Sequence, residues 1–322
     1  MSSSSELARV AGLRRCFERN TPGIRVGIGD DAAVLEAIGA GALVWTVDAQ
    51  VDGTHFRTDW VSWEDVGWRS FMAAASDLAA MGAEPVAALS SLVLAPSIDD
   101  AALDAIARGQ AAASDEVGAP VVGGNLARGT ETSLTTTLLG RAALPVLRSG
   151  ARVGDALWLA GPVGLAAAGL AWLQGARTPC ASPNDAHAAS CVRAWRRPVA
   201  RIGHGRALAG VAHAAIDISD GLAHDAAQLA EASGVGFVLD LAAVLAAGGD
   251  ALAGGSGLLG RAPADFALYG GEDYAVLAAS PIDLPGFARI GTVEAWTGGA
   301  RVYMKTAGAT IPVDPRGFDH FG

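Results

Sequence analysis

Acidic residues directly follow apolar, strand-like runs at several separate places in this sequence. The run AAIDISDG at 214–221 starts as a buried strand would, and then places Asp217 and Asp220 where the chain turns into a helical pattern. A desolvated carboxylate is costly unless a positive group balances it, so the fold must bring these acids to such a group. The acids in comparable positions are Asp30, Asp31, Asp48, Asp77, Asp217, Asp220, Glu272 and Asp273.

Magnesium ions offer a shared explanation for these acids. Aspartate is unfavourable inside a helix because its short side chain competes for backbone groups, yet Asp77 lies within a helical pattern rich in alanine. A single aspartate at a strand end is more often a cap or a turn residue. The same arrangement in five segments instead favours a set of oxygen ligands for Mg²⁺, with the metal carrying the charge of a phosphate.

Charge and cysteine content limit the classes of function. The net charge is −10, Lys305 is the single lysine, and no basic run is present, so nucleic-acid binding is not expected. Three cysteines without a CxxC pair, Cys16, Cys180 and Cys191, indicate a reducing compartment and no structural zinc. The apolar stretch 156–173 is broken by Gly-Pro, which favours a strand, a turn and a helix over a membrane span. With no signal-peptide pattern, we expect a cytoplasmic protein that binds no membrane.

Two common nucleotide-binding motifs are excluded. The segment GIGDDA at 27–32 matches the dinucleotide fingerprint, but Asp30 and Asp31 occupy the place of the pyrophosphate and would repel it. No GxxxxGK[ST] motif is present, so the residues rule out a P-loop enzyme, and with Lys305 as the one possible lysine clamp they also rule out an enzyme of the protein-kinase type.

The apolar periodicity predicts an α+β fold of two domains, residues 1–145 and 146–322, because strands and helices do not alternate regularly. In the first domain we expect helices at 5–19, 62–85 and 99–117, and strands at 24–35, 42–56, 86–96, 119–129 and 133–142. In the second domain we expect a strand within 148–161, helices to about 212, a strand–turn–helix at 215–233, a strand at 236–241 and a glycine-rich loop that includes 254–260.

Two further segments are ambiguous when taken alone. VVGGN at 121–125 places Gly123 and Gly124 where backbone could approach a ligand closely, but a simple β-turn explains the pair equally well. DGTHF at 52–56 places His55 beyond a strand end, and a lone histidine is more often a structural hydrogen-bonding group.

Taken together, the segments resemble the thiamine-monophosphate kinase family, in the ATP-binding superfamily that includes aminoimidazole-ribonucleotide synthetase and selenophosphate synthetase. The resemblance implies an N-terminal α/β domain with a dimer-forming β-sheet, and a C-terminal α/β domain of the aminoimidazole-ribonucleotide synthetase-like type. The matching pieces run in the family's order from residue 27 to 321: GIGDDAAVL, TVDAQVDGTHF, ASDLAAMGAEP, VGGN, LRSGARVGD, DISDGLAHD, YGGEDY and GFDHF.

The resemblance also implies an activity: phosphorylation of thiamine monophosphate by ATP to give thiamine diphosphate, the last step of its biosynthesis. It implies several Mg²⁺ ions, a homodimer, and direct in-line transfer without a protein base. The implied ATP contacts are Gly123, Gly124, Arg148 and Ser219. The implied substrate contacts are His55, Glu272 and Phe318. The implied metal ligands are Asp30, Thr46, Asp48, Asp77, Asn125, Asp217 and Asp220.

Asn125 departs from the family pattern, in which an aspartate follows the glycine pair. Asparagine keeps a carbonyl oxygen for Mg²⁺ but loses a negative charge, so one metal site is expected to be weaker. The departure leaves open a thiamine-phosphate binding protein that has lost turnover, beside an acidic dimer with no chemistry.

Other enzymes of the superfamily fit less well. A selenophosphate synthetase would carry a reactive cysteine in a glycine-rich segment, which Cys16 lacks around it. A hydrogenase-maturation relative would end in a cysteine, whereas this chain ends FDHFG. An aminoimidazole-ribonucleotide synthetase would lack YGGEDY and FDHF in this form.

Overall fold

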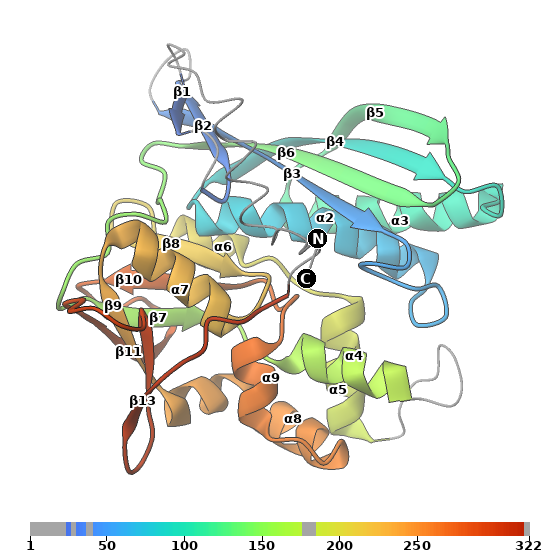
Figure 1. The fold of residues 1–322 in the computed structure, drawn as a ribbon. Coiled ribbons are helices and arrows are strands. Elements are labelled where there is room, and N and C mark those ends of the chain that lie inside the picture. Colours follow the sequence, from blue (N-terminus) through green and yellow to red (C-terminus); the bar gives the residue numbers. More distant parts are fainter. Residues whose placement is uncertain (1–23, 27–29, 37–40, 176–184, 319–322) are drawn as a thin grey trace, which may run out of the picture.

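The computed structural model describes residues 24–26, 30–36, 41–175 and 185–318, and it contains two mixed sheets with helices packed on them (Figure 1). The strands of the first sheet are β1 (Ile24–Val26), β2 (Ala33–Glu36), β3 (Ala42–Val51), β4 (Glu84–Leu94), β5 (Val121–Arg128) and β6 (Ser133–Ala142). Their order is β1-β2-β3-β6-β4-β5, and only the β4–β5 pair is parallel. The helix predicted at 5–19 lies outside the described residues.

Helices α2 (Trp63–Ala80) and α3 (Asp100–Val117) cover one face of the first sheet (Figure 1). Alternation along β3 and β6 selects that face, since Val44 and Leu138 are buried while Val47 on the other face is 63% exposed. Ser62 caps the start of α2, because its side chain accepts a hydrogen bond from the Asp65 N–H at 3.2 Å. The α2 helix therefore starts where the sequence predicts.

The second sheet has strand order β13-β12-β9-β11-β7-β10-β8. Its strands are β7 (Ala156–Ala160), β8 (Ala214–Ile218), β9 (Gly236–Asp240), β10 (Ala275–Ser280), β11 (Ala288–Glu294), β12 (Val302–Lys305) and β13 (Thr310–Pro312). Its helices are α4 (Leu165–Gly175), α5 (Ala186–Arg196), α6 (Ile202–Arg206), α7 (Leu222–Ser233), α8 (Leu241–Leu258) and α9 (Pro263–Tyr269). The α+β organisation in two domains is as predicted, and the sheets change between Ala142 and Ala156.

The α2 helix lies between the two sheets, which explains why it is buried nearly all round. Strands β8 and β10 are buried along their whole length, because α2 packs on one face of them and the core of the second domain, which includes α7, covers the other. A strand covered on both faces has an apolar sequence without alternation, as in AAIDI at 214–218. Acids at the ends of these strands consequently lie near α2, at the junction of the domains.

Two sequence-based assignments were wrong in detail. The segment 24–35 is not one strand, because a bend at Asp31–Ala32 separates β1 from β2. The glycine-rich segment 254–260 is not a loop, because α8 continues to Leu258. Gly254 and Gly255 face α5: a Cβ at Gly254 would lie 2.4 Å from the His187 ring, so glycine lets the two helices approach.

Helix α8 has the length and composition of a membrane-spanning helix. However, Gly249 interrupts it with non-helical dihedral angles (φ 60°, ψ −162°), and its buried residues Val244 and Leu252 belong to the core of the second domain. The apolar stretch 156–173 forms β7, a turn and most of α4, as predicted. Of the cysteines, Cys191 is buried, and the other two lie outside the described residues.

Candidate active site at the domain junction

Three aspartates from distant parts of the chain meet where the two domains join. Asp31 precedes β2, Asp77 belongs to α2 and Asp217 belongs to β8, and one carboxylate oxygen of each lies within 4.8 Å of the other two. The Asp31 side chain is fully buried, and Asp217 is 4% exposed. We refer to these three residues as the aspartate cluster.

The aspartate cluster has few groups to balance its charge. Thr46 Oγ1 donates to Asp77 Oδ2, and Ser76 Oγ donates to Asp217 Oδ2 at 2.6 Å. Burial raises the pKa of all three aspartates, and repulsion between the carboxylates raises the pKa of Asp77 and Asp217 further. The fold therefore holds these acids close together at a considerable electrostatic cost.

Arg148 supplies the ion pair of the aspartate cluster. Its Nε donates to Asp31 Oδ1 at 2.9 Å, and its Nη2 contacts the same oxygen. The other oxygen, Asp31 Oδ2, is buried and receives no hydrogen bond from the residues that the structure describes. A buried carboxylate oxygen without a donor, beside two more carboxylates and a threonine hydroxyl, fits the hard oxygen ligands that Mg²⁺ prefers.

Asp30 and Asp31 face different partners. The Arg148 backbone N–H donates to Asp30 Oδ2 at 3.2 Å, while Asp31 enters the aspartate cluster. Burial and the neighbouring charge of Asp31 raise the pKa of Asp30 to about 6. The family resemblance implied Asp30 as the ligand here and did not single out Asp31, although the adjacent acids in GIGDDA were a visible signal.

A cavity of about 550 Å³ opens beside the aspartate cluster. Many of the residues implied by the resemblance line it: Asp48, His55, Ser219, Asp220, Glu272 and Phe318. Aromatic residues that the sequence analysis did not select, Trp60, Trp195 and Tyr274, line it as well. The cavity thus combines carboxylates with flat apolar surfaces.

Glu272 is held in the cavity wall by Arg69 and Trp195. Arg69 is 1% exposed and donates to Glu272 Oε1 and to the Trp195 carbonyl oxygen. Trp195 Nε1 donates to Glu272 Oε2 at 2.6 Å, and the Arg69 guanidinium stacks 4.4 Å from the centre of its ring. The sequence analysis missed both partners, and an arginine within the apolar stretch of α2 was the available signal.

The backbone around Glu272 is unusual. Glu272 and Tyr274 have positive φ angles of 65° and 48°, a conformation that costs on the order of 1–3 kcal/mol for residues other than glycine. Two hydrogen bonds hold it, from Glu272 N–H to the Ser219 carbonyl oxygen at 2.7 Å and from Tyr274 N–H to that of Ile218 at 2.9 Å. The neighbouring Asp273 instead accepts hydrogen bonds from the N–H groups of Gly164 and Ala166 at the start of α4.

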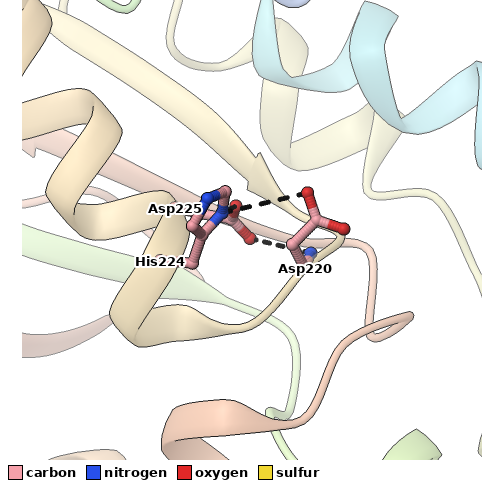
Figure 2. Close-up of side chains that lie close together, drawn as sticks. All are labelled: Asp220, His224 and Asp225. Carbon is pink, nitrogen blue, oxygen red and sulfur yellow. Dashed lines mark hydrogen bonds and ion pairs between the residues drawn. The ribbon is translucent and has the colours of Figure 1, made fainter. Parts of the chain in front are cut away.

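The turn Ser219–Gly221 joins β8 to α7 and carries Asp220 towards the cavity. Figure 2 shows Asp220 opposite His224 and Asp225, two neighbouring residues of α7. His224 Nδ1 lies 3.1 Å from Asp225 Oδ1 and 3.9 Å from Asp220 Oδ2. This contact with Asp225 raises the pKa of His224.

Gly123, Gly124 and Asn125 lie apart from the aspartate cluster within one chain. They belong to β5, the exposed edge strand of the first sheet. The register places Gly124 three strands from Asp48, a separation of roughly 14 Å at ~4.8 Å per strand. A Cβ at Gly124 would lie 1.8 Å from the Ser90 carbonyl oxygen, so strand pairing alone requires glycine there.

His55 has a structural partner as well as a place in the cavity. Its Nδ1 accepts a hydrogen bond from the Val51 N–H at 3.1 Å, which holds the turn that follows β3. The structural and the functional interpretations of His55 are therefore compatible.

Comparison with known proteins agrees with this architecture. Residues 29–142 match the family "AIR synthase related protein, N-terminal domain", and residues 152–261 match "AIR synthase related protein, C-terminal domain". The chain is thus a two-domain protein of the AIR synthase related class. A thiamine-monophosphate kinase of Mycobacterium tuberculosis is 37% identical over 291 residues, which cover 85% of this chain and 84% of that protein. One of Salmonella typhimurium is 33% identical over 318 residues, 92% of both chains. This chain belongs to the thiamine-monophosphate kinase family.

A solved structure described as AaThiL complexed with AMPPCP and TMP has the same fold. It aligns with a TM-score of 0.87 and 29% sequence identity, covering 98% of this chain and 97% of that chain. The similarity therefore includes both domains and the junction between them.

Proposed function

We propose that this chain transfers the γ-phosphoryl group of ATP to thiamine monophosphate, giving thiamine diphosphate and ADP. The single observation that carries the proposal is the aspartate cluster beside a cavity of about 550 Å³ with aromatic walls. Curated relatives are named thiamine-monophosphate kinases, and AaThiL is described in complex with AMPPCP and TMP.

The acids of the junction would hold the metal. When bound, Mg²⁺ neutralises phosphate charge and orients the transferred group. Arg148, fixed by Asp31, adds positive charge on the nucleotide side. The attacking phosphate is a monoester that is already mostly dianionic near neutral pH, so no protein base is needed and positioning dominates. The residues proposed to hold Mg²⁺ are Asp30, Asp31, Thr46, Asp48, Asp77, Asn125, Asp217 and Asp220.

The cavity suits the acceptor. Thiamine carries a flat cationic thiazolium ring, which favours aromatic faces and a nearby negative charge. Phe318, 50% exposed, and the half-buried Trp60 offer aromatic surface, and Glu272 offers the charge at a fixed position. We propose that these residues bind the thiamine portion, while its phosphate points towards Asp48 and Asp220.

We also propose that the protein is a homodimer formed through the first sheet. The face of this sheet opposite α2 carries exposed apolar side chains, among them Val47 at 63% and Trp45 at 49%. Leu89 of β4, 43% exposed, lies in register with Val47 across β6 and extends the apolar surface on the same face. A second copy would cover this surface and bring its own β5, with Asn125, to this face.

The experiment is an incubation of the purified protein with ATP, MgCl₂ and thiamine monophosphate, with thiamine phosphates resolved by chromatography. We expect thiamine diphosphate and an equal amount of ADP, and neither in a matched tube with EDTA. Thermal stabilisation by Mg²⁺-ATP without product would instead identify a binding protein that has lost turnover. A cytoplasmic location, without membrane or nucleic-acid partners, remains a proposal from the sequence.

A further inference from the structure

The turn Ser219–Gly221 directs three consecutive N–H groups at one carboxylate oxygen. Asp225 Oδ2 accepts from the N–H of Ser219 at 3.0 Å, of Asp220 at 3.1 Å and of Gly221 at 3.2 Å. Figure 2 shows Asp225 facing the Asp220 backbone across this turn. Asp225 is 1% exposed, so the three bonds form in a buried, low-dielectric place, where charged hydrogen bonds are strong.

The carbonyl groups of the same turn hold residues from elsewhere in the cavity. The Ser219 carbonyl oxygen accepts from the Glu272 N–H at 2.7 Å, and the Asp220 carbonyl oxygen accepts from the Phe318 N–H at 3.1 Å. Two residues proposed for the acceptor side are thus hydrogen-bonded through their backbones to the turn that carries Ser219 and Asp220. A displacement of the turn would therefore move the residues proposed for the metal side and those proposed for the acceptor side together.

Glycine at two positions makes this arrangement close-fitting. A Cβ at Gly271 would lie 2.3 Å from the Ser219 carbonyl oxygen, so the segment before Glu272 packs directly on the turn. Gly221 has φ 121° and lies against the backbone of Tyr269, which leaves the turn little room to shift on that side. The hydrogen bonds to Asp225 restrain the turn through its N–H groups.

We propose that Asp225 is a positioning residue for phosphoryl transfer. Its carboxylate fixes the Ser219–Gly221 turn. This turn then fixes Asp220 on the metal side, and it fixes Glu272 and Phe318 on the acceptor side. The role rests on the proposed function, because positioning has consequences for turnover only if the chain is a kinase. Asp225 itself is not among the residues that line the cavity.

The test combines substitution with chemical rescue. Asp225→Ala should lower kcat/KM for thiamine monophosphate about 100-fold, as expected when reacting groups are misplaced by about 1 Å. Added formate, a small carboxylate that fits the vacated space, should restore at least part of this loss. Asp225→Asn, which keeps one acceptor oxygen without the charge, should lose about tenfold and should not respond to formate.

Asp240→Ala is the matched control. Asp240 also accepts two backbone N–H bonds at a helix start in the second domain, from Ala242 and Ala243, but it is not a cavity residue. We expect it to lower thermal stability by a similar amount with nearly normal kcat/KM and no formate effect. Loss of activity in step with stability in both variants, or no rescue of Asp225→Ala, would overturn the proposal.

Hydrogen exchange separates this proposal from the proposed function. The amides of Ser219, Asp220 and Gly221 should be protected in the wild type, exposed in Asp225→Ala and protected again with formate. If the wild type forms no thiamine diphosphate, the proposed function fails, while the exchange pattern still decides whether Asp225 fixes the turn. Unchanged exchange in Asp225→Ala would rule out that role even in an active enzyme.

Discussion

The domain junction contains two kinds of carboxylate that differ in what balances their charge. Glu272 accepts bonds from an arginine and an indole, and Asp225 accepts three backbone N–H groups. Asp31, Asp77 and Asp217 instead share one arginine and two hydroxyl groups in the described part of the chain. The first kind is satisfied by the chain itself, and the second kind is not.

Under the proposed function, the difference separates acids that stabilise the site from acids that would bind Mg²⁺. A satisfied carboxylate stabilises the fold, so its loss should destabilise the protein. A crowded carboxylate with a raised pKa destabilises the fold by itself, so its loss should relieve repulsion while abolishing metal binding. The predictions below test this distinction, in order of decreasing effect.

The largest effect is expected for Asp217→Asn. Removing a charge that would face the metal should lower kcat by about 10²–10³-fold, the range for loss of one preorganised electrostatic contact. The Ser76 hydroxyl can still donate to the asparagine oxygen, so the melting temperature in EDTA should stay equal or rise. Differential scanning fluorimetry with EDTA and with Mg²⁺-ATP measures both. A clear fall of the melting temperature in EDTA would contradict the assignment of Asp217 to the unbalanced kind.

Glu272→Gln should have the opposite effect on stability. It leaves Arg69, 1% exposed, without its counter-charge, which should cost about 2–3 kcal/mol, less than the ~3–5 kcal/mol of a fully buried pair because the Glu272 side chain is 25% exposed. The KM for thiamine monophosphate should rise about tenfold, the equivalent of one charged hydrogen bond, while the KM for ATP stays unchanged. Urea unfolding and steady-state kinetics measure the two effects.

Trp195→Phe is the control for this second prediction. It removes only the indole N–H that donates to Glu272 Oε2 and keeps an aromatic ring in the wall. It should cost about 1 kcal/mol in stability and raise the same KM less. If the variant changes the KM equally in the Glu272→Gln background, Trp195 does not act through Glu272.

Local patterns were enough to predict much of the site. Asp217 and Asp220 lie in or just after a strand that is apolar without alternation, and Asp77 interrupts a small-residue helix, so their place beside the core could be inferred from neighbours in sequence. The α2 N-cap and the order of elements follow from equally local signals. A cap or a strand end depends on a few adjacent residues, which explains why these predictions were correct.

The missed features depend on contacts between distant residues. Arg69 and Glu272 are 203 positions apart, and nothing near either residue indicates the other. The place of Asp31 in the aspartate cluster, beside Asp77 and Asp217, depends on a bend before β2. The glycines of α8 suggested a loop because their partner, α5, is invisible in the local sequence. Tertiary packing overrides local propensity in each case.

Asp30 and the aspartate cluster should also make the stability of the fold depend on pH. The pKa of Asp30 is about 6 in the fold against an ordinary value of 3.8, and burial also raises the pKa of the aspartate cluster. The fold then binds protons more tightly than the unfolded chain, so stability is present at low pH and is lost as pH rises through these raised values. In EDTA the melting temperature should fall by a few degrees from about pH 5 to about pH 8. The gain from Mg²⁺, which binds the deprotonated acids, should grow over the same range; a constant gain would contradict this.

The smallest effect is expected for Asn125→Asp. The added carboxylate would belong neither to the carboxylates satisfied by the chain nor to the aspartate cluster. Asn125 is exposed on β5, so the change should alter stability by no more than about 0.5 kcal/mol. If a second copy brings β5 to the junction, the added charge should lower the Mg²⁺ concentration needed for half-maximal turnover by about two- to threefold, a modest gain for one exposed charge. Asn125→Ala is the matched control and should shift that concentration the other way. A large loss of activity in Asn125→Asp would mean that the side chain amide of Asn125 donates to a ligand, because only its N–H groups are removed while an oxygen acceptor is kept.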